Sequence, residues 1–232
     1  MPFVPLIRDP AGPSRSRIAL ASILVLFAST LAAQSDSTRT LSYEFGFFVS
    51  LDYSETVPRL RPREEVAPVH RDSLVSFGDI HGTGFSLGIQ YKQRLLKGLS
   101  VRVVPSLNFL GCELDHYYYH GTVERISFDR TEVGLAVQPM YAPRLSGPSH
   151  AYMVGGLYVG YAPAQTSMLV PISVRFDYGM GIGTRLKYFS ITGEGRIAVQ
   201  TNNLLVQDGS FYSDIVERLG INVFSLRLII HA

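Results

Sequence analysis

The chain has little charge, a single cysteine and no tryptophan. Charged residues make up 17% of its 232 residues, below the roughly 25% that is usual for soluble domains. Because Cys112 is the only cysteine, an intrachain disulfide and a zinc site built from several cysteines are both excluded.

The sequence also lacks a basic excess once its first 33 residues are set aside. That segment holds three of the 21 basic residues (Arg8, Arg15 and Arg17) and one of the 19 acidic residues (Asp9), so 18 of each remain. A neutral chain gives no support for nucleic-acid binding, which depends on a basic surface.

What the chain has in abundance favours β structure. Hydrophobic residues make up 46% of it, with 13 Tyr, 13 Phe and 21 Gly. Aromatic residues favour strands and glycines favour turns. The length suits one sizeable domain.

The N-terminal segment has the pattern of an export signal. Arg15 and Arg17 precede "IALASILVLFASTLAAQ", an apolar run that ends in small residues. The run is shorter than the ~20 residues that a membrane-spanning helix needs, although a short membrane anchor is the alternative. We predict a cleavable signal peptide over 1–33, a short linker over 34–40 and a barrel domain over 41–232.

The stretch "LSYEFGFFVSLDYS" at 41–54 alternates with period two. Its odd positions are all apolar, and its even positions are polar or small apart from Phe48. Similar segments of strand length follow at 84–93, 99–110, 130–141, 151–161, 172–186, 189–200 and 222–230. This pattern predicts eight strands, each near or above the ~9–11 residues that cross a bilayer at a tilt. Segment 151–161 is apolar on both faces, so the sequence does not decide which of its faces points outward.

The connections between these segments tend to alternate between long and short. Long ones are expected at 55–80, 113–129 and 201–219, short ones at 94–98 and 187–188, and ones of medium length at 142–150 and 162–171. This alternation is typical of outer-membrane barrels. An even number of strands would place both termini in the periplasm.

The polar face carries balanced charge rather than a lysine- and glutamate-rich surface. Five acidic residues stand against five arginines, which suits a closed interior where each charge finds a partner. These inward residues are Glu44, Asp52, Glu132, Asp177 and Glu194 with Arg102, Arg175, Arg185, Arg196 and Arg227. Phe48 is expected to pack against inward glycines such as Gly179, Gly181 and Gly183.

We therefore expect the apolar faces to meet lipid. An aromatic girdle is expected near the short turns, formed by Tyr43, Tyr91, Tyr141, Tyr152, Tyr188 and Phe189. The predicted fold is all-β, an eight-stranded antiparallel transmembrane β-barrel of the outer membrane. Its lumen would be filled by side chains. A secreted lipocalin-like or sandwich protein is the alternative.

The last part of the chain resembles a known family. The stretch "TNNLLVQDGSFYSDIVERLGINVFSLRLII" at 201–230 looks like the final loop and strand of PorT-type outer-membrane barrels, components of the type IX secretion system. "DRTEVGLAVQPMY", "AYMVGGLYVGY" and "FDYGMGIGTRLKYFSITGEGRIAVQ" are similar to earlier strands of that family. The family-like motif comprises Asn202, Asn203, Leu204, Asp208, Tyr212 and Ser213.

The resemblance implies a role in assembling or operating a secretion apparatus through protein contacts, with no enzymatic activity and no cofactor. The alternative is a small OmpA- or opacity-type barrel, serving adhesion or envelope integrity, and a narrow pore is a third class. No small-molecule substrate is identified.

Two chemical alternatives compete with this structural interpretation. "ELDHYYYH" at 113–120 places Asp115, His116 and His120 in an expected external loop, but a metal site needs three or four converging ligands, so no metal is expected. A rim enzyme would combine such histidines with Asp129 or Asp208, yet no pair has diagnostic spacing.

Overall fold

The structure, a computed structural model, describes residues 43–68, 74–77, 81–118, 123–143, 149–163, 169–207 and 211–231. The predicted signal peptide and linker lie outside these residues. No helix within the described ranges combines the length and the apolar character that a bilayer crossing requires.

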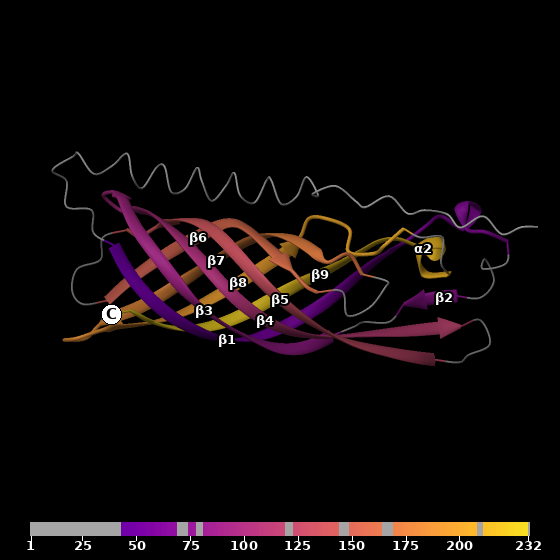
Figure 1. Cartoon of the computed structure of the whole chain (residues 1–232), viewed down its shortest axis with the longest axis horizontal. Helices are drawn as coiled ribbons and strands as arrows, with labels where there is room; N and C mark the ends of the chain where they lie inside the picture. The colour runs from indigo at the N-terminus through magenta and orange to yellow at the C-terminus, as the bar shows by residue number, and fades with distance from the viewer. Residues whose placement is uncertain are drawn as a thin grey trace, which may run out of the picture. The chain divides into compact units, whose positions relative to one another are not determined.

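Eight strands form a closed ring in the described part of the chain (Figure 1). Neighbours follow the order β4-β3-β1-β9-β8-β7-β6-β5, and β5 pairs back with β4. All these pairings are antiparallel, which confirms the predicted eight-stranded barrel. The strands are β1 (Tyr43–Leu60), β3 (His81–Leu96), β4 (Leu99–Tyr118), β5 (Val123–Tyr141), β6 (Ser149–Tyr161), β7 (Ile172–Arg185), β8 (Ser190–Gln200) and β9 (Val216–His231).

Pairing between the first and last strands closes the barrel. β1 pairs with β9 from Gly46↔His231 to Leu60↔Val216, with one irregularity near Arg59. Closure removes the free strand edges that an open sheet would leave, so backbone groups within the ring are paired.

Three smaller elements lie outside the ring. β2 (Leu74–Phe77) pairs only with the far end of β4. A 3-10 turn, η1 (Arg63–Glu65), follows β1, and a short helix, α2 (Phe211–Ile215), precedes β9. All three belong to the long connections.

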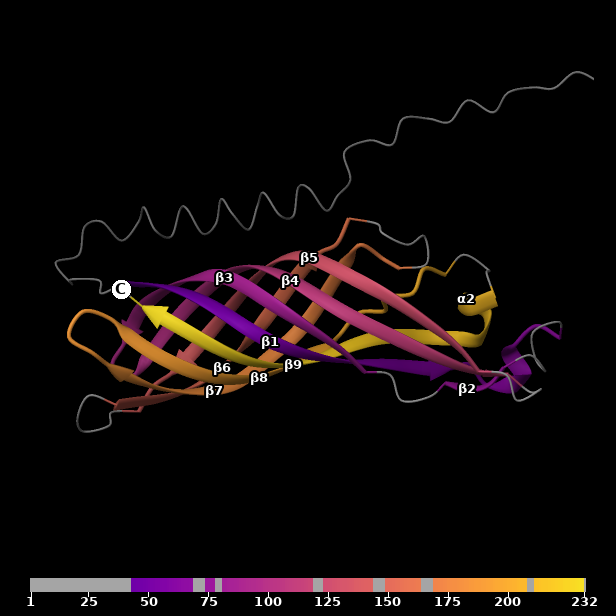
Figure 2. The same cartoon turned by 90° about the horizontal axis from the view of Figure 1, so that it is seen from below.

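The β4–β5 hairpin is much longer than predicted. Its pairing runs from Leu99↔Tyr141 to Tyr117↔Val123, whereas β5 pairs with β6 only from Val133↔Tyr161 onward. The hairpin therefore projects beyond the barrel (Figure 2). The prediction of a loop over 113–129 was wrong, because both strands continue past the ring and pair with each other there, from Glu113↔Ser127 to Tyr117↔Val123.

The two ends of the barrel differ as predicted. The β3–β4 turn at Lys97–Gly98 is tight, with Gly98 at φ +84°, a conformation that favours glycine. The β7–β8 connection at 186–189 is closed by the Leu186 amide donating to the Phe189 carbonyl at 2.8 Å. We call this the short-turn end, where β9 also ends (Figure 1). The other is the long-loop end.

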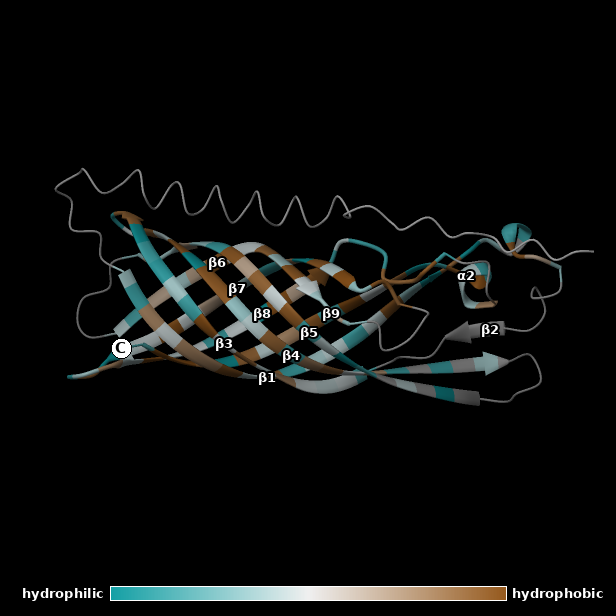
Figure 3. Ribbon diagram, viewed as in Figure 1, coloured by the Kyte–Doolittle hydropathy of each residue, from teal (hydrophilic) through white to brown (hydrophobic). Residues whose placement is uncertain are grey.

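Hydrophobic and hydrophilic residues alternate along the strands (Figure 3), and their exposure places the apolar ones outside the barrel and the polar ones inside. Leu51 is 74% exposed, whereas Glu132 and Gln138 are 0% exposed. This is the reverse of a soluble protein. The outward direction predicted for the odd positions of 41–54 is confirmed by the exposure of Tyr43, Phe45, Phe47, Val49, Leu51 and Tyr53.

The structure also decides the facing of β6. Met153, Leu157, Val159 and Tyr161 are exposed, whereas Tyr152 and Tyr158 are buried in the lumen. The prediction that Tyr152 belongs to an outer aromatic girdle was therefore wrong. Its hydroxyl has a buried partner in Glu194, at 2.6 Å, which compensates the cost of turning a tyrosine inward.

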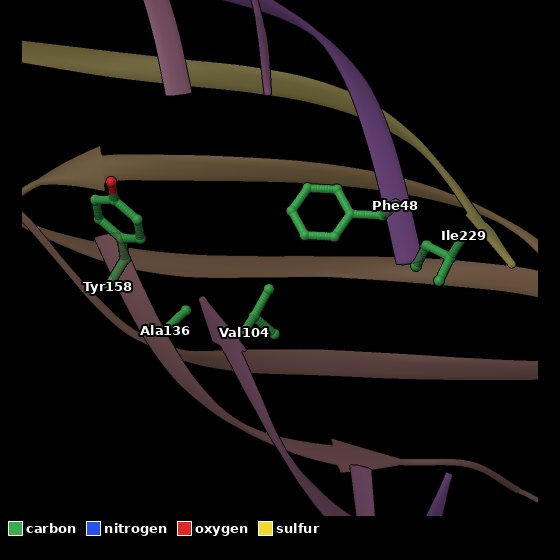
Figure 4. Close-up of a cluster of buried hydrophobic side chains, with 5 residues drawn as sticks. All are labelled: Phe48, Val104, Ala136, Tyr158 and Ile229. Carbon is green, nitrogen blue, oxygen red and sulfur yellow. The ribbon is translucent and has the colours of Figure 1, made fainter. Parts of the chain in front are cut away.

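Phe48 belongs to an apolar layer that crosses the lumen. It packs with Val104, Ala136, Tyr158 and Ile229, from five different strands (Figure 4). Its ring lies over Gly88, its partner on β3, where an added β-carbon would come within 2.6 Å of Phe48 Cε1. Phe48 thus packs on an inward glycine, but on β3 rather than on β7.

Candidate functional site

The lumen contains a buried polar network in two layers separated by the Phe48 layer. In the first layer, toward the short turns, Arg102 donates to both oxygens of Glu194, at 2.6 and 2.8 Å. Arg102 Nε also donates to Gln138 Oε1 at 2.7 Å. Arg102 and Glu194 come from β4 and β8, which are not neighbours in the ring. The network therefore bridges the lumen.

The second layer is built around Glu132. This carboxylate accepts from Arg130 Nε at 2.6 Å, from the Tyr158 hydroxyl at 3.1 Å and from Arg175. Tyr158 in turn accepts a hydrogen bond from Asn108 at 2.6 Å. One buried carboxylate thus serves two guanidinium groups, which leaves positive charge in excess around it.

Asp177 and Asp52 complete the second layer. Asp177 pairs with Arg196 and accepts from Gln138 Nε2 at 2.9 Å, which connects the two layers. Asp52 accepts from the Ser50 hydroxyl at 3.0 Å and from the Ser86 hydroxyl.

Two of the ten sequence-predicted charges lie at the rim instead. Glu44 pairs with Lys92 at 2.7 Å where its side chain is 43% exposed, and Arg185 is exposed at the β7–β8 turn. Arg227 lies in the lumen, with its guanidinium 4.3 Å from the centre of the Phe48 ring.

Arg130 was missed by the sequence analysis. It is 4% exposed and lies two residues before Glu132 on β5, so it has the inward parity that marked Glu132. Its even position therefore marked it as inward-facing, but it is the first residue of the predicted segment 130–141 and was not included among the lumen charges. Among the described residues, the lumen thus holds five arginines (Arg102, Arg130, Arg175, Arg196 and Arg227) and four carboxylates (Asp52, Glu132, Asp177 and Glu194).

A folded segment closes the lumen at the long-loop end. Asn203 Oδ1 accepts from the amides of Leu205 and Leu219, at 3.0 and 2.9 Å, and its Nδ2 donates to the Glu217 carbonyl at 3.1 Å. Leu204, between these anchors, is 0% exposed. We call residues 202–205 the mouth segment.

Asn202 anchors the mouth segment from its other side. Its Oδ1 accepts from the Val174 amide at 2.7 Å, and its Nδ2 donates to the Ile172 carbonyl at 2.9 Å. Leu204 then packs in an apolar cluster with Leu110, Cys112, Ile221 and Val223. Asn202, Asn203 and Leu204 thus hold the mouth segment against the barrel.

The other family-like residues lie close by or outside the described residues. Ser213 is buried in α2, and its carbonyl accepts from Arg61 Nε at 3.3 Å. Tyr212 packs against the cluster of Leu205, Val216 and Leu219. Asp208 lies outside the described residues.

The projecting hairpin carries an ion pair where a metal site was considered. Arg125 donates to both oxygens of Asp115, at 2.7 and 3.0 Å. This hydrogen bonding raises the pKa of Arg125. His120 lies outside the described residues, as does the side chain of His116. Within the described part of the chain, no group of three or more His, Cys, Asp or Glu side chains is placed to hold a metal ion.

No protein-family model and no curated protein matches the chain. Several solved structures are similar in architecture. Neisserial surface protein A (NspA) has a TM-score of 0.45 and 11% identity, covering 82% of this chain and 98% of that one. The outer membrane protein OprG from Pseudomonas aeruginosa has a TM-score of 0.42 and 10% identity, covering 80% and 94%.

The translocator domain of the autotransporter NalP from Neisseria meningitidis is also similar, with a TM-score of 0.33 and 9% identity, covering 92% of this chain and 96% of that one. At these identities the likeness concerns the fold. The ring of strand pairings by itself establishes that the chain is a closed, eight-stranded antiparallel β-barrel.

Proposed function

We propose that this protein resides in the bacterial outer membrane, exported by its N-terminal signal, with both termini in the periplasm. The observation that carries this proposal is the exposed apolar surface around the ring, which includes Leu51, Met180, Ile182 and Leu226. Such a surface is too large for a soluble monomer. Lipid covers it at no cost, while the closed ring leaves no unpaired strand edge in the hydrocarbon.

We further propose that the barrel acts through protein contacts at its long-loop end. Its lumen is crossed by ion pairs and by the Phe48 layer, and the mouth segment covers one end. A filled lumen suits a scaffold better than a conduit. The projecting β4–β5 hairpin, which extends well past the ring, offers a rigid surface for a partner protein.

The specific role we propose is in the assembly or operation of a type IX secretion system. This proposal is supported by the resemblance of residues 201–230 to PorT-type barrels. Within that stretch, the side chains of Asn202 and Asn203 accept hydrogen bonds that hold the mouth segment to the barrel. The alternative is a small general barrel with an adhesion or envelope-integrity role, which the same filled lumen and projecting hairpin favour equally. A narrow pore is the third class.

Gene deletion separates these roles. The type IX proposal predicts that a deletion strain retains proteins bearing type IX sorting domains inside the cell, and that the full-length gene restores their secretion. Normal secretion together with detergent sensitivity or lost adhesion would instead support the small-barrel alternative. Conductance of the purified protein in planar bilayers would support the pore.

A shortened hairpin tests the proposed contact surface. Residues 114–126 are replaced by Asn-Gly, which closes a two-residue turn on the Glu113↔Ser127 pair. This variant is expected to form a heat-modifiable barrel but to lose co-purification of its partner from native membranes. Asp115→Asn with Arg125→Gln in the full-length hairpin is the matched control for charge alone. Unchanged partner recovery with the shortened hairpin would refute the assignment of the surface.

A further inference from the structure

We propose that the lumen holds a small monatomic anion of the chloride class, bound between Arg196 and Arg227. The candidate site is a small cavity of about 20 Å³ in the second polar layer. The charged side chains that line it are Asp52, Asp177, Arg175, Arg196 and Arg227, and Ser225 also lines it.

The excess of positive charge in the lumen favours a bound anion. The described residues of the lumen carry five guanidinium groups and four carboxylates, and the fifth arginine, Arg227, has no hydrogen bond or ion pair with a carboxylate. An uncompensated charge inside a barrel is costly because no water solvates it fully. One bound monovalent anion would make the lumen neutral.

The unpaired polar groups of the lumen also favour an anion. Within the described residues, the buried side-chain atoms without a hydrogen-bond partner are Arg196 Nε, Arg196 Nη1 and Arg227 Nε, which are all donors. Arg196 Nε lies 3.5 Å from Glu194 Oε1, an ion-pair distance without hydrogen-bond geometry. Arg196 itself is 3% exposed. Donors without acceptors call for an anion.

The carboxylates beside the cavity are already engaged. Asp177 accepts from Arg196 and Gln138, and Asp52 accepts from the hydroxyls of Ser50 and Ser86. Their charge is therefore partly neutralised by their own donors. A water molecule would bring two protons as well as lone pairs, and so it would match these donors less well than a halide does.

Apolar residues border the cavity on two sides. The cavity shares Tyr158 with the Phe48 layer on one side, and Leu110 and Val223 with the apolar cluster beneath the mouth segment on the other. A cavity must offer roughly 10–15 Å³ to hold one water-sized particle, so this one has room for a single small particle and none for sulfate or phosphate.

The experiment is a crystal structure of the full-length protein, purified from membranes in detergent and crystallised in sodium bromide. Anomalous scattering is expected to show a bromide ion in hydrogen-bonding contact with Arg196 and Arg227. Ordered water, an empty cavity, or bromide only at exposed lysines such as Lys97 and Lys187 would overturn the proposal. The wild-type map decides the question whether or not any variant folds.

Variants and stability give a second test. Arg227→Met is expected to abolish the bromide peak, whereas Arg125→Met, on the projecting hairpin, is expected to leave it. Asp52→Asn keeps both arginines and is expected to retain the peak. On detergent gels, the temperature at which the folded form of the protein disappears should rise with chloride concentration. It should not rise with gluconate concentration, because only a ligand that binds the folded state stabilises it. Equal behaviour in the two salts would contradict the site.

Discussion

At the scale of single residues, the barrel depends on a few buried charges that are matched across the lumen. Arg102, Glu194 and Tyr152 come from β4, β8 and β6 and meet through three hydrogen bonds of 2.6 to 2.8 Å. Removing one partner leaves the others desolvated, which costs more than the intact pair contributes. Substitutions in the lumen should therefore differ sharply from substitutions at the rim.

Glu194→Gln is expected to destabilise the barrel strongly. The glutamine keeps the shape but leaves Arg102 without its counter-charge, and breaking a buried pair in this way costs about 3–5 kcal/mol. The matched control is Glu217→Gln, whose pair with Arg59 at 2.9 Å is exposed, so it should cost less than about 1 kcal/mol. Unfolding of the barrel in urea, followed by gel mobility, measures both. Equal losses would show that the lumen pair has no special role.

Gly88→Ala tests the close packing of the Phe48 layer. The added methyl group would meet the backbone carbonyl of Pro105 and also the Phe48 ring, at 2.6 and 2.8 Å from two of its carbons. Overpacking of this kind costs about 1–3 kcal/mol. Gly195→Ala is the control, because a β-carbon there meets nothing within 4 Å. We expect lower urea stability for the first variant and no loss for the second; a neutral Gly88→Ala would mean that the layer is loosely packed.

At the scale of elements, the mouth segment and the β4–β5 hairpin distinguish this barrel from a plain ring of strands. The mouth segment is held by side-chain amides together with backbone hydrogen bonds of Leu204 to Val170 and Leu219. The hairpin is held by its own ladder and by the Asp115–Arg125 pair. The first shapes the end of the lumen, and the second shapes the surface beyond it.

Asn203→Ala is expected to loosen the mouth segment while leaving the barrel intact. The variant loses three hydrogen bonds and leaves the amides of Leu205 and Leu219 without an acceptor. A buried unsatisfied group costs about 1–3 kcal/mol. Hydrogen exchange of these two amides should become faster, whereas Gln207→Ala, at an exposed position, should leave it unchanged. Unaltered exchange in Asn203→Ala would show that strand pairing alone holds the segment.

At the scale of the whole molecule, the apolar belt outside and the ion pairs inside invert the usual distribution of polarity. Leu51 pairs with Phe85 on β3 and with Leu226 on β9, and all three are exposed. A continuous belt of this kind is stable only where lipid or detergent covers it.

Leu51→Arg distinguishes a membrane barrel from a soluble one. On a lipid-facing surface near the bilayer centre, arginine costs about 2–4 kcal/mol and its cost falls to about 0–1 kcal/mol near the interface. Leu186→Arg, at the β7–β8 turn, is the interfacial control. Folding into lipid vesicles measures the difference. A soluble barrel would instead tolerate or favour arginine at the exposed Leu51 position, so a neutral result would contradict the membrane proposal.

Much of the barrel follows from the sequence alone because a strand has a period of two. Alternation determined the number of strands and the outward residues of β1, and the gaps between the alternating segments located the short turns. The inward parity also selected Asp52, Arg102, Glu132 and Glu194 as candidates for the lumen. These results depend only on each strand's own residues.

Tertiary structure alone decided how those residues meet. Which guanidinium faces which carboxylate depends on the stagger of strands around the ring, so the Arg102–Glu194 pair between β4 and β8 is invisible in either segment. The same holds for Tyr152, whose hydroxyl donates to Glu194 inside the lumen, and for Arg227, whose Nε has no hydrogen-bond partner among the described residues. Alternation sets which face a residue takes, but only closure of the barrel sets its partner.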